Sequence, residues 1–194
     1  MADNPTQTDD APLTASKRSG AAAELTGQIA EAQGSSVLGR SVTINKPASE
    51  LFSYFRNFGN LPNFMENVVS IDVLDDQRSH WKVKGPAGRQ VEWDARVTEE
   101  EPNRLIGWTS EAGADVPNSG RIEFKEAGAR GTVVTVTIAY DPPGGVIGKA
   151  IAKMFQREPG IQARRDLNRF KQLMETGEIA TPAVNPKQFE EMGL

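Results

Sequence analysis

Six runs of alternating apolar and polar residues follow one another along residues 68–140, and this series constrains the fold more than any other feature of the chain. Such alternation is typical of strands that bury one face, so the first run is expected to turn Val69, Ile71 and Val73 inward. Short turns carrying Gly or Pro join the runs, and strands joined in this way lie antiparallel. The six runs are 68–76, 80–85, 89–100, 104–110, 119–126 and 131–140.

A seventh strand and two helical segments precede this series. Residues 38–47 alternate in the same way and predict a strand. Residues 47–57 predict a helix that starts at a proline, where the missing N–H does no harm. Residues 58–68 predict a short second helix or turn, because Gly59 and Pro62 interrupt them.

A long amphipathic helix is expected after the last strand, ending near Thr176, with Pro159 kinking or splitting it between its two halves. A curved sheet of this width cannot close its own inner face, and one helix about 10 Å across covers only part of it. The pattern therefore predicts a cavity between sheet and helix. The apolar stripe of the helix comprises Ile147, Ile151, Met154, Phe155, Ala163, Leu167, Phe170 and Met174.

The two ends of the chain differ from the middle. Residues 1–36 hold too few large apolar side chains to offset the entropy of ordering and predict a disordered N-terminal arm. A docking helix in residues 21–33 is the alternative. The folded domain is expected over 37–176, and residues 177–194 predict a C-terminal tail.

Composition excludes several classes of chemistry. The chain has no Cys and one His, which excludes disulfides, thiolate nucleophiles, iron–sulfur clusters and metal sites built on several His ligands. Residues 144–150 are Gly-rich but match neither the dinucleotide nor the P-loop spacing. We therefore expect no metal and no cofactor.

Charge and hydropathy limit the partners. The formal net charge of −4 leaves no excess of positive charge for phosphates, so we expect no nucleic-acid partner. No apolar stretch approaches the roughly 18 residues of a membrane span, and we expect no stable membrane insertion. The acidic, polar N-terminus lacks the features of a signal peptide, which makes the cytoplasm the expected location.

Residues 38–176 resemble the START-like superfamily, often called SRPBCC, and within it the bacterial polyketide cyclase/dehydrase and lipid-transport group. The resemblance is carried by SVTINKPASELFSYFRNFGNLPNFME, WKVKGPAGRQVEWDARVTEEEPNRLIGW, PNSGRIEF and VTIAYDPPGGVIGKAI leading into DLNRFKQLMETGEI. It implies an α+β helix-grip fold: a curved seven-stranded antiparallel sheet wrapped on a long C-terminal helix, with two short helices after strand one. The superfamily includes lipid carriers, coenzyme Q-binding proteins and aromatic cyclases.

Three groups of apolar residues are candidates for contact with a ligand, and plain core packing is the alternative for each. Aromatic residues on the inward faces of strands can stack on an apolar ligand. The resemblance places residues 58–66 at the lip of the pocket, as a gate or as packing that holds a short helix on the sheet. The candidates are Trp81, Trp93, Trp108, Phe124 and Tyr140 on strands, Phe58, Leu61, Phe64 and Met65 in the lip, and Ile151 and Phe155 on the long helix.

The charged residues give no catalytic set. His80 lies on the opposite side of its strand from inward Trp81 and is expected to face solvent. Glu92 and Asp94 share a face with Arg96, which favours a solvated charge ladder over an acid/base pair. A charged cluster on the long helix is interpreted as a solvated face, with contact to anionic lipid headgroups as the alternative. That cluster comprises Arg157, Glu158, Arg164, Arg165, Asp166, Arg169 and Lys171.

Three functions remain open. The leading hypothesis is a non-enzymatic protein that binds, and by extension transports, a hydrophobic small molecule such as a lipid, a quinone or a polyketide-like aromatic. The alternative is an aromatase/cyclase that closes and dehydrates a polyketide-like chain by aldol chemistry. A stress-related or assembly protein, using its N-terminal arm to reach partners, is the third. An apolar cavity favours carriage, whereas charged groups that point inward favour catalysis.

Overall fold

The structure is a computed structural model. The residues that it describes are 36–85, 88–140 and 159–180. The predicted N-terminal arm up to residue 35, the first half of the long helix with Ile151 and Phe155, and the tail beyond residue 180 lie outside the described residues.

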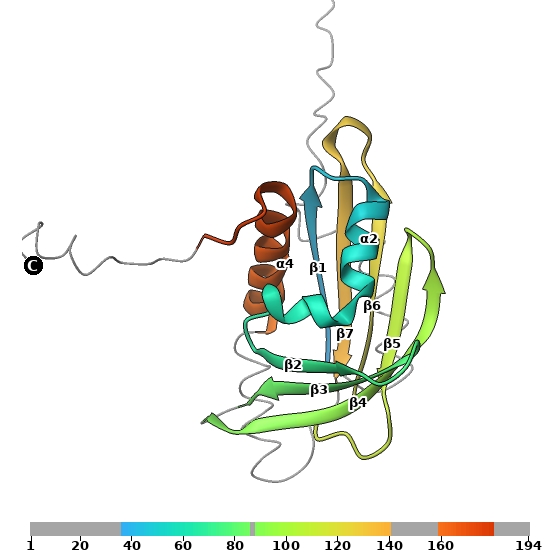
Figure 1. The fold of residues 1–194 in the computed structure, drawn as a ribbon, viewed down its shortest axis with the longest axis vertical. Coiled ribbons are helices and arrows are strands. Elements are labelled where there is room, and N and C mark those ends of the chain that lie inside the picture. The colour runs from blue at the N-terminus through green and yellow to red at the C-terminus, as the bar shows by residue number, and fades with distance from the viewer. Residues whose placement is uncertain (1–35, 86–87, 141–158, 181–194) are drawn as a thin grey trace, which may run out of the picture.

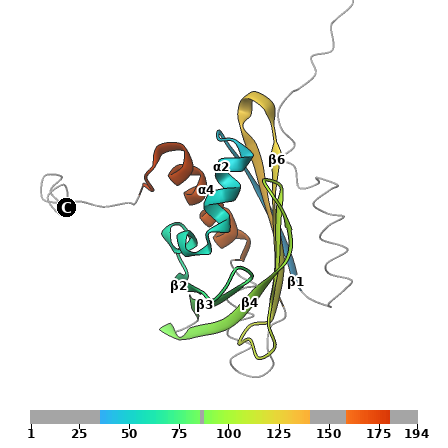
Figure 2. The same ribbon diagram turned by 45° about the vertical axis from the view of Figure 1, so that its right-hand side comes forward.

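Seven strands form one antiparallel sheet in the order β1-β7-β6-β5-β4-β3-β2, as the sequence pattern predicts. Neighbours from β2 to β7 are consecutive in the chain, and β1 pairs with β7. The sheet curls so that β2, β3 and β4 turn beneath the helices (Figures 1 and 2). The strands are β1 Ser36–Ile44, β2 Val68–Val73, β3 Arg78–Lys84, β4 Gln90–Glu101, β5 Leu105–Ser110, β6 Asn118–Glu126 and β7 Thr132–Tyr140.

A bulge in β2 corrects one detail of the predicted alternation. The pairing with β3 shifts between Val68 and Ser70, so Val68 packs on the core and Val69 is 42% exposed. An extra residue in one strand leaves that residue unpaired and bends the strand. Ile71 faces inward as expected, but Val73, at the end of this edge strand, is 56% exposed.

The helices lie on the concave side of the sheet, as Figure 2 shows for α2 and α4. Helix α2 (Ala48–Arg56) follows β1, and the 3-10 helix η2 (Phe58–Asn63) follows α2. A second short 3-10 helix, η4 (Gly128–Arg130), forms part of the turn between β6 and β7.

Helix α4 (Pro159–Thr176) begins at the proline that was expected to interrupt the long helix. Its C-terminal half is tied to the chain around β1: the Lys171 ammonium donates to the carbonyl of Thr43 at 2.6 Å, and the backbone N–H of Asn45 donates to Glu175 at 2.6 Å. Gly177, in the left-handed conformation with φ 78°, ends the helix.

Aromatic side chains form the solid part of the core, between the two helices and the sheet. The rings of Phe64 and Phe170 stack with centroids 4.7 Å apart. Phe55 contacts both of them, and it also meets Phe124 edge-on, as Phe52 does. Because this cluster fills the space beneath α2, the rest of the concave face is left for a cavity.

Candidate functional site: an internal cavity

An apolar cavity of about 240 Å³ lies between the concave face of the sheet, the segment around η2 and helix α4. Its sheet wall comes from all strands except β1, and α4 contributes one turn and a half. Aromatic and aliphatic side chains make up most of the wall, which is typical of sites for small apolar ligands. The few polar side chains in the wall are Asn67, Ser79, Arg96, Asn118, Tyr140, Gln162 and Asp166.

The structure brings eight of the eleven predicted ligand contacts together around this cavity. The four residues of the lip, which we keep as the name for residues 58–66, all border it, although they are separated in sequence from the strands opposite. Three tryptophans and one tyrosine from the sheet complete the set. These eight are Phe58, Leu61, Phe64, Met65, Trp81, Trp93, Trp108 and Tyr140.

Phe124 is a correction to the predicted set. It is 3% exposed and lies in the aromatic core, where its ring contacts Phe52 and Phe55 rather than the cavity. Its strand turns it inward as the alternation requires, but α2 covers that part of the sheet. Facing inward and bordering the cavity are therefore different properties on this sheet.

The tryptophan side chains have defined neighbours. The rings of Trp81 and Trp93 stack across β3 and β4 with centroids 6.1 Å apart, and the indole N–H of Trp81 donates to Ser79 Oγ at 2.9 Å. The ring of Trp108 lies over Gly120 on β6, where a Cβ atom would fall 2.5 Å from Trp108 Cζ2. Because residue 120 is a glycine, the Trp108 ring has room to lie in the cavity wall.

Helix α4 holds the lip through three contacts, which we call the clasp. The Arg169 guanidinium donates to the carbonyl of Phe64 at 2.9 Å. The backbone N–H of Glu66 donates to the Asp166 carboxylate at 3.3 Å, and the Glu66 side chain pairs with Arg165 at 3.5 Å. These contacts join segments about a hundred residues apart in sequence and fix one edge of the cavity.

Asp166 corrects the interpretation of the charged cluster on the long helix. It is 9% exposed and lines the cavity instead of facing solvent. Burial raises the pKa of its carboxyl group to about 6, although hydrogen bonds from Glu66 and Gln162 act in the opposite direction. The signal was present in the sequence: Asp166 follows Ala163 by three positions and precedes Leu167 and Phe170, so it lies within the apolar stripe.

Glu92 and Asp94, two members of the predicted charge ladder, lie on the outer face of the sheet beside His80, whereas Arg96, the third, is among the residues that line the cavity. His80 pairs across the sheet with Asp94, and its Nδ1 lies 2.7 Å from the Asp94 carboxylate. Its Nε2 lies 3.4 Å from Glu92. The hydrogen bond with Asp94 raises the pKa of the His80 imidazole. The histidine is on the outer side, as predicted, but the two carboxylates cover part of it, and neither the histidine nor these carboxylates reach the cavity.

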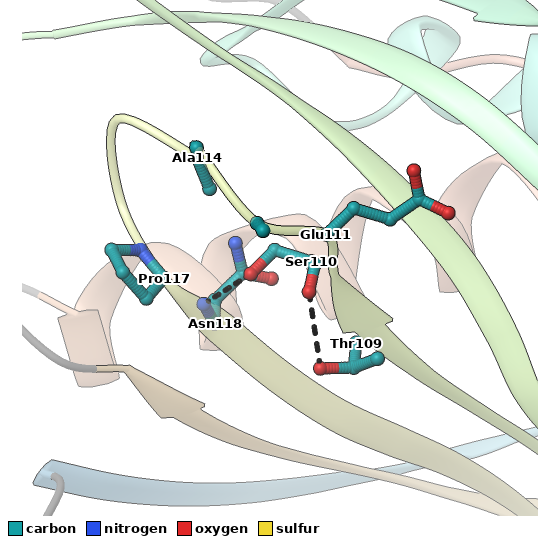
Figure 3. A pocket seen from close by; sticks show the side chains of 8 residues that line it. Thr109, Ser110, Glu111, Ala114, Pro117 and Asn118 are labelled. Atoms are coloured by element: carbon teal, nitrogen blue, oxygen red, sulfur yellow. Dashed lines mark hydrogen bonds between the residues drawn. The ribbon is translucent and has the colours of Figure 1, made fainter.

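A second hollow of about 270 Å³ lies in the loop between β5 and β6 (Figure 3). Loop residues line it, and Ser110 accepts a hydrogen bond from the backbone N–H of Asn118 at 3.0 Å. Ala112 and Gly113 are exposed, so this hollow is a surface depression that offers little apolar area to a ligand. We take the internal cavity as the candidate site.

The described residues hold neither a metal-binding cluster nor a helix that could span a membrane. Across 36–85, 88–140 and 159–180, acidic and histidine side chains do not gather in a group that could hold a metal ion. Within the same ranges, every helix is too short or too polar to cross a membrane.

A curved antiparallel sheet that grips a C-terminal helix over an internal cavity defines the helix-grip class, of which START-like proteins are members. The chain belongs to the family described as polyketide cyclase/dehydrase and lipid transport, whose sequence pattern matches residues 44–167. The predicted family and fold are thereby confirmed.

Solved structures agree with this assignment. A Deinococcus radiodurans protein is 41% identical and matches 74% of this chain and 99% of its own, with a TM-score of 0.61. The Zhui aromatase/cyclase of a Streptomyces species is 14% identical, with 75% and 99% matched and a TM-score of 0.58. A START superfamily protein of Mycobacterium smegmatis is 16% identical, with 71% and 98% matched and a TM-score of 0.53. At such low identities the last two show a shared fold.

Proposed function

We propose that this protein binds a hydrophobic small molecule in the internal cavity, and that binding serves its storage or transport. A lipid, a quinone or a polyketide-like aromatic is the class of ligand that the wall suits. The observation that carries the proposal is the largely apolar cavity of about 240 Å³. We also propose a cytoplasmic location and, because the formal net charge is −4, no nucleic-acid partner.

The energy of an empty cavity supports the proposal. Unfilled apolar volume costs about 24 cal/mol per Å³, so this cavity would cost on the order of 6 kcal/mol if nothing occupied it. The whole net stability of a domain is only about 5–15 kcal/mol. A chain under selection for stability alone would fill such a space with larger side chains, whereas a ligand that enters it recovers part of the cost.

One observation favours the aromatase/cyclase alternative. Asp166 places a carboxyl group with a pKa of about 6 inside the cavity, where it could hold or release a proton beside a bound carbonyl compound. A single carboxyl group without a second proton-transferring partner nearby is a weaker basis than the apolar wall. Binding therefore stays the leading proposal.

A pair of variants tests the proposal. Trp108 borders the cavity and Phe124 lies in the solid core, so Trp108→Ala is expected to weaken binding of the apolar fluorophore 1-aminoanthracene about tenfold or more at a modest cost in stability. Phe124→Ala is expected to cost about 3–5 kcal/mol of stability and to leave binding by the folded fraction unchanged. Fluorescence titration and urea denaturation measure the two quantities.

The opposite pattern contradicts the proposal. A Trp108→Ala protein that binds 1-aminoanthracene as tightly as the parent would place Trp108 outside the site. Failure of the parent to bind this probe or any other apolar probe would remove the proposal. Mass spectrometry of the molecule that co-purifies with the native protein would identify the ligand class directly.

A further inference from the structure

The two carboxyl oxygens of Asp166 differ in their hydrogen bonding. Oδ1 accepts hydrogen bonds from the Glu66 backbone N–H at 3.3 Å and from the Gln162 side-chain amide at 2.8 Å. For Oδ2, no described residue donates a hydrogen bond. The side chain borders the cavity, so this second oxygen is an acceptor available at the wall of an otherwise apolar space.

The described charged groups around Asp166 form no ion pair with it, although the Arg169 charge lowers the pKa of its carboxyl group and the Glu66 charge raises it. On α4, the Arg169 guanidinium donates its Nε–H to Phe64, and Arg165 pairs with Glu66. From the sheet side, Lys84 reaches the Glu66 carbonyl at 3.4 Å, and Arg96 borders the cavity. Within the described residues none of these cations lies within ion-pair distance of the Asp166 carboxylate.

An acidic side chain held in this way is costly. A buried carboxyl group loses its hydration on folding, and a well-packed apolar residue at the same position of the stripe would avoid that cost. Groups of this kind concentrate at functional sites. Gln162 and the lip fix Oδ1, so Oδ2 is oriented before any ligand arrives.

We infer that Asp166 is the polar anchor of the cavity and that Oδ2 accepts a hydrogen bond from a hydroxyl group of an otherwise apolar ligand. This inference rests on the proposed function and narrows it. The ligand class becomes an apolar molecule, aromatic or alicyclic, with a free hydroxyl at one end. Esters, ethers and hydrocarbons of the same shape would lack this contact.

A matched pair of probes tests the anchor. 2-Naphthol carries a hydroxyl group, whereas in 2-methoxynaphthalene a methyl group replaces the hydroxyl hydrogen. At about pH 7.5 the parent protein is expected to bind 2-naphthol about tenfold more tightly, because a hydrogen bond to a charged acceptor is among the stronger ones. In Asp166→Asn the preference should fall to about twofold or reverse, since the amide offers a donor in place of one oxygen. Isothermal titration calorimetry gives both affinities.

The control is Arg164→Gln, two residues away at an exposed position of α4, which should keep the tenfold preference. A measurement on the unmodified protein covers the case in which Asp166→Asn does not fold. At about pH 4.5, where Asp166 is largely protonated, the preference of the parent should shrink to about threefold or less.

The outcomes separate the two proposals. Equal binding of both probes by the parent at about pH 7.5, or a preference that Asp166→Asn or acid leaves intact, would overturn the anchor and leave the hydrophobic site standing. Absence of binding by both probes would overturn the proposed function and the anchor with it.

Discussion

The effect of a single side chain on the stability of this protein depends on how deeply its surroundings bury it. Asp166 is an acid in an apolar stripe, and burial holds its pKa at about 6 against an ordinary value of 3.8. The folded protein therefore binds this proton more tightly than the unfolded chain does. Stability contributed by the protonated form is present at low pH and is lost as the pH rises from about 4 to about 6.

A comparison with Asp166→Asn isolates this effect. The free energy of unfolding of the parent relative to the variant should fall by about 2.5 kcal/mol between about pH 4 and about pH 7, since each pKa unit corresponds to about 1.4 kcal/mol. Urea denaturation at several pH values measures it. Taking the difference cancels the titration of His80, whose pKa is also raised. Parallel pH profiles for parent and variant would contradict a buried, titrating Asp166.

At the scale of elements, the turn between β6 and β7 packs against the end of β1, and this contact restricts the residues that the turn can accept. Gly128 and Gly131 both have positive φ, 59° and 85°. A Cβ at Gly131 would collide with the carbonyl of Ile44, whereas a Cβ at Gly128 would meet nothing within 4 Å. The backbone conformation is thus strained for any other residue at both positions, but steric conflict arises at one.

Alanine substitutions at these two positions should differ in how much they lower the free energy of unfolding. Gly128→Ala is expected to cost about 1 kcal/mol, the usual penalty for a left-handed non-glycine residue. Gly131→Ala should cost at least about 3 kcal/mol, because φ 85° and ψ −122° lie in a region that only glycine readily adopts, and a Cβ there would also overpack against the end of β1. Thermal and urea denaturation of the two variants give the comparison. Equal costs would show that the end of β1 moves freely away from the turn.

The elements were largely predictable from the sequence, and the cavity wall was predictable in part. Alternation identified the seven strands because most of them bury one face more than the other. It did not locate the bulge that exposes Val69, which depends on pairing with β3. Nor could it show that α2 shields Phe124 from the cavity, because that depends on where a helix lies in space. The prediction that Asp166 faces solvent was wrong, because it relied on the charge of the side chain and not on its position within the apolar stripe of the helix.

At the scale of the whole molecule, the described domain starts with β1, so removal of residues 1–35 leaves every strand intact. Because that segment has few large apolar side chains, its deletion is expected to change the free energy of unfolding by less than about 1 kcal/mol. Urea denaturation of the full and shortened chains measures the difference.

A larger loss would show that Leu25 and Ile29 pack on the domain. Substitution of both Leu25 and Ile29 by Ser in the full chain would then reproduce the loss.

The clasp between α4 and the lip is expected to set how fast a ligand enters and leaves the cavity. A contact that must break before a ligand enters or leaves adds the same barrier in both directions. Weakening it should therefore speed capture and release together and leave the equilibrium affinity nearly unchanged. Arg169→Gln, which loses the charged donor to Phe64, should raise both rate constants about tenfold, whereas Arg164→Gln, at an exposed position nearby, should change neither. Stopped-flow fluorescence with 1-aminoanthracene would show it, and faster release with unchanged capture would mean that Arg169 strengthens the bound state instead of setting its residence time.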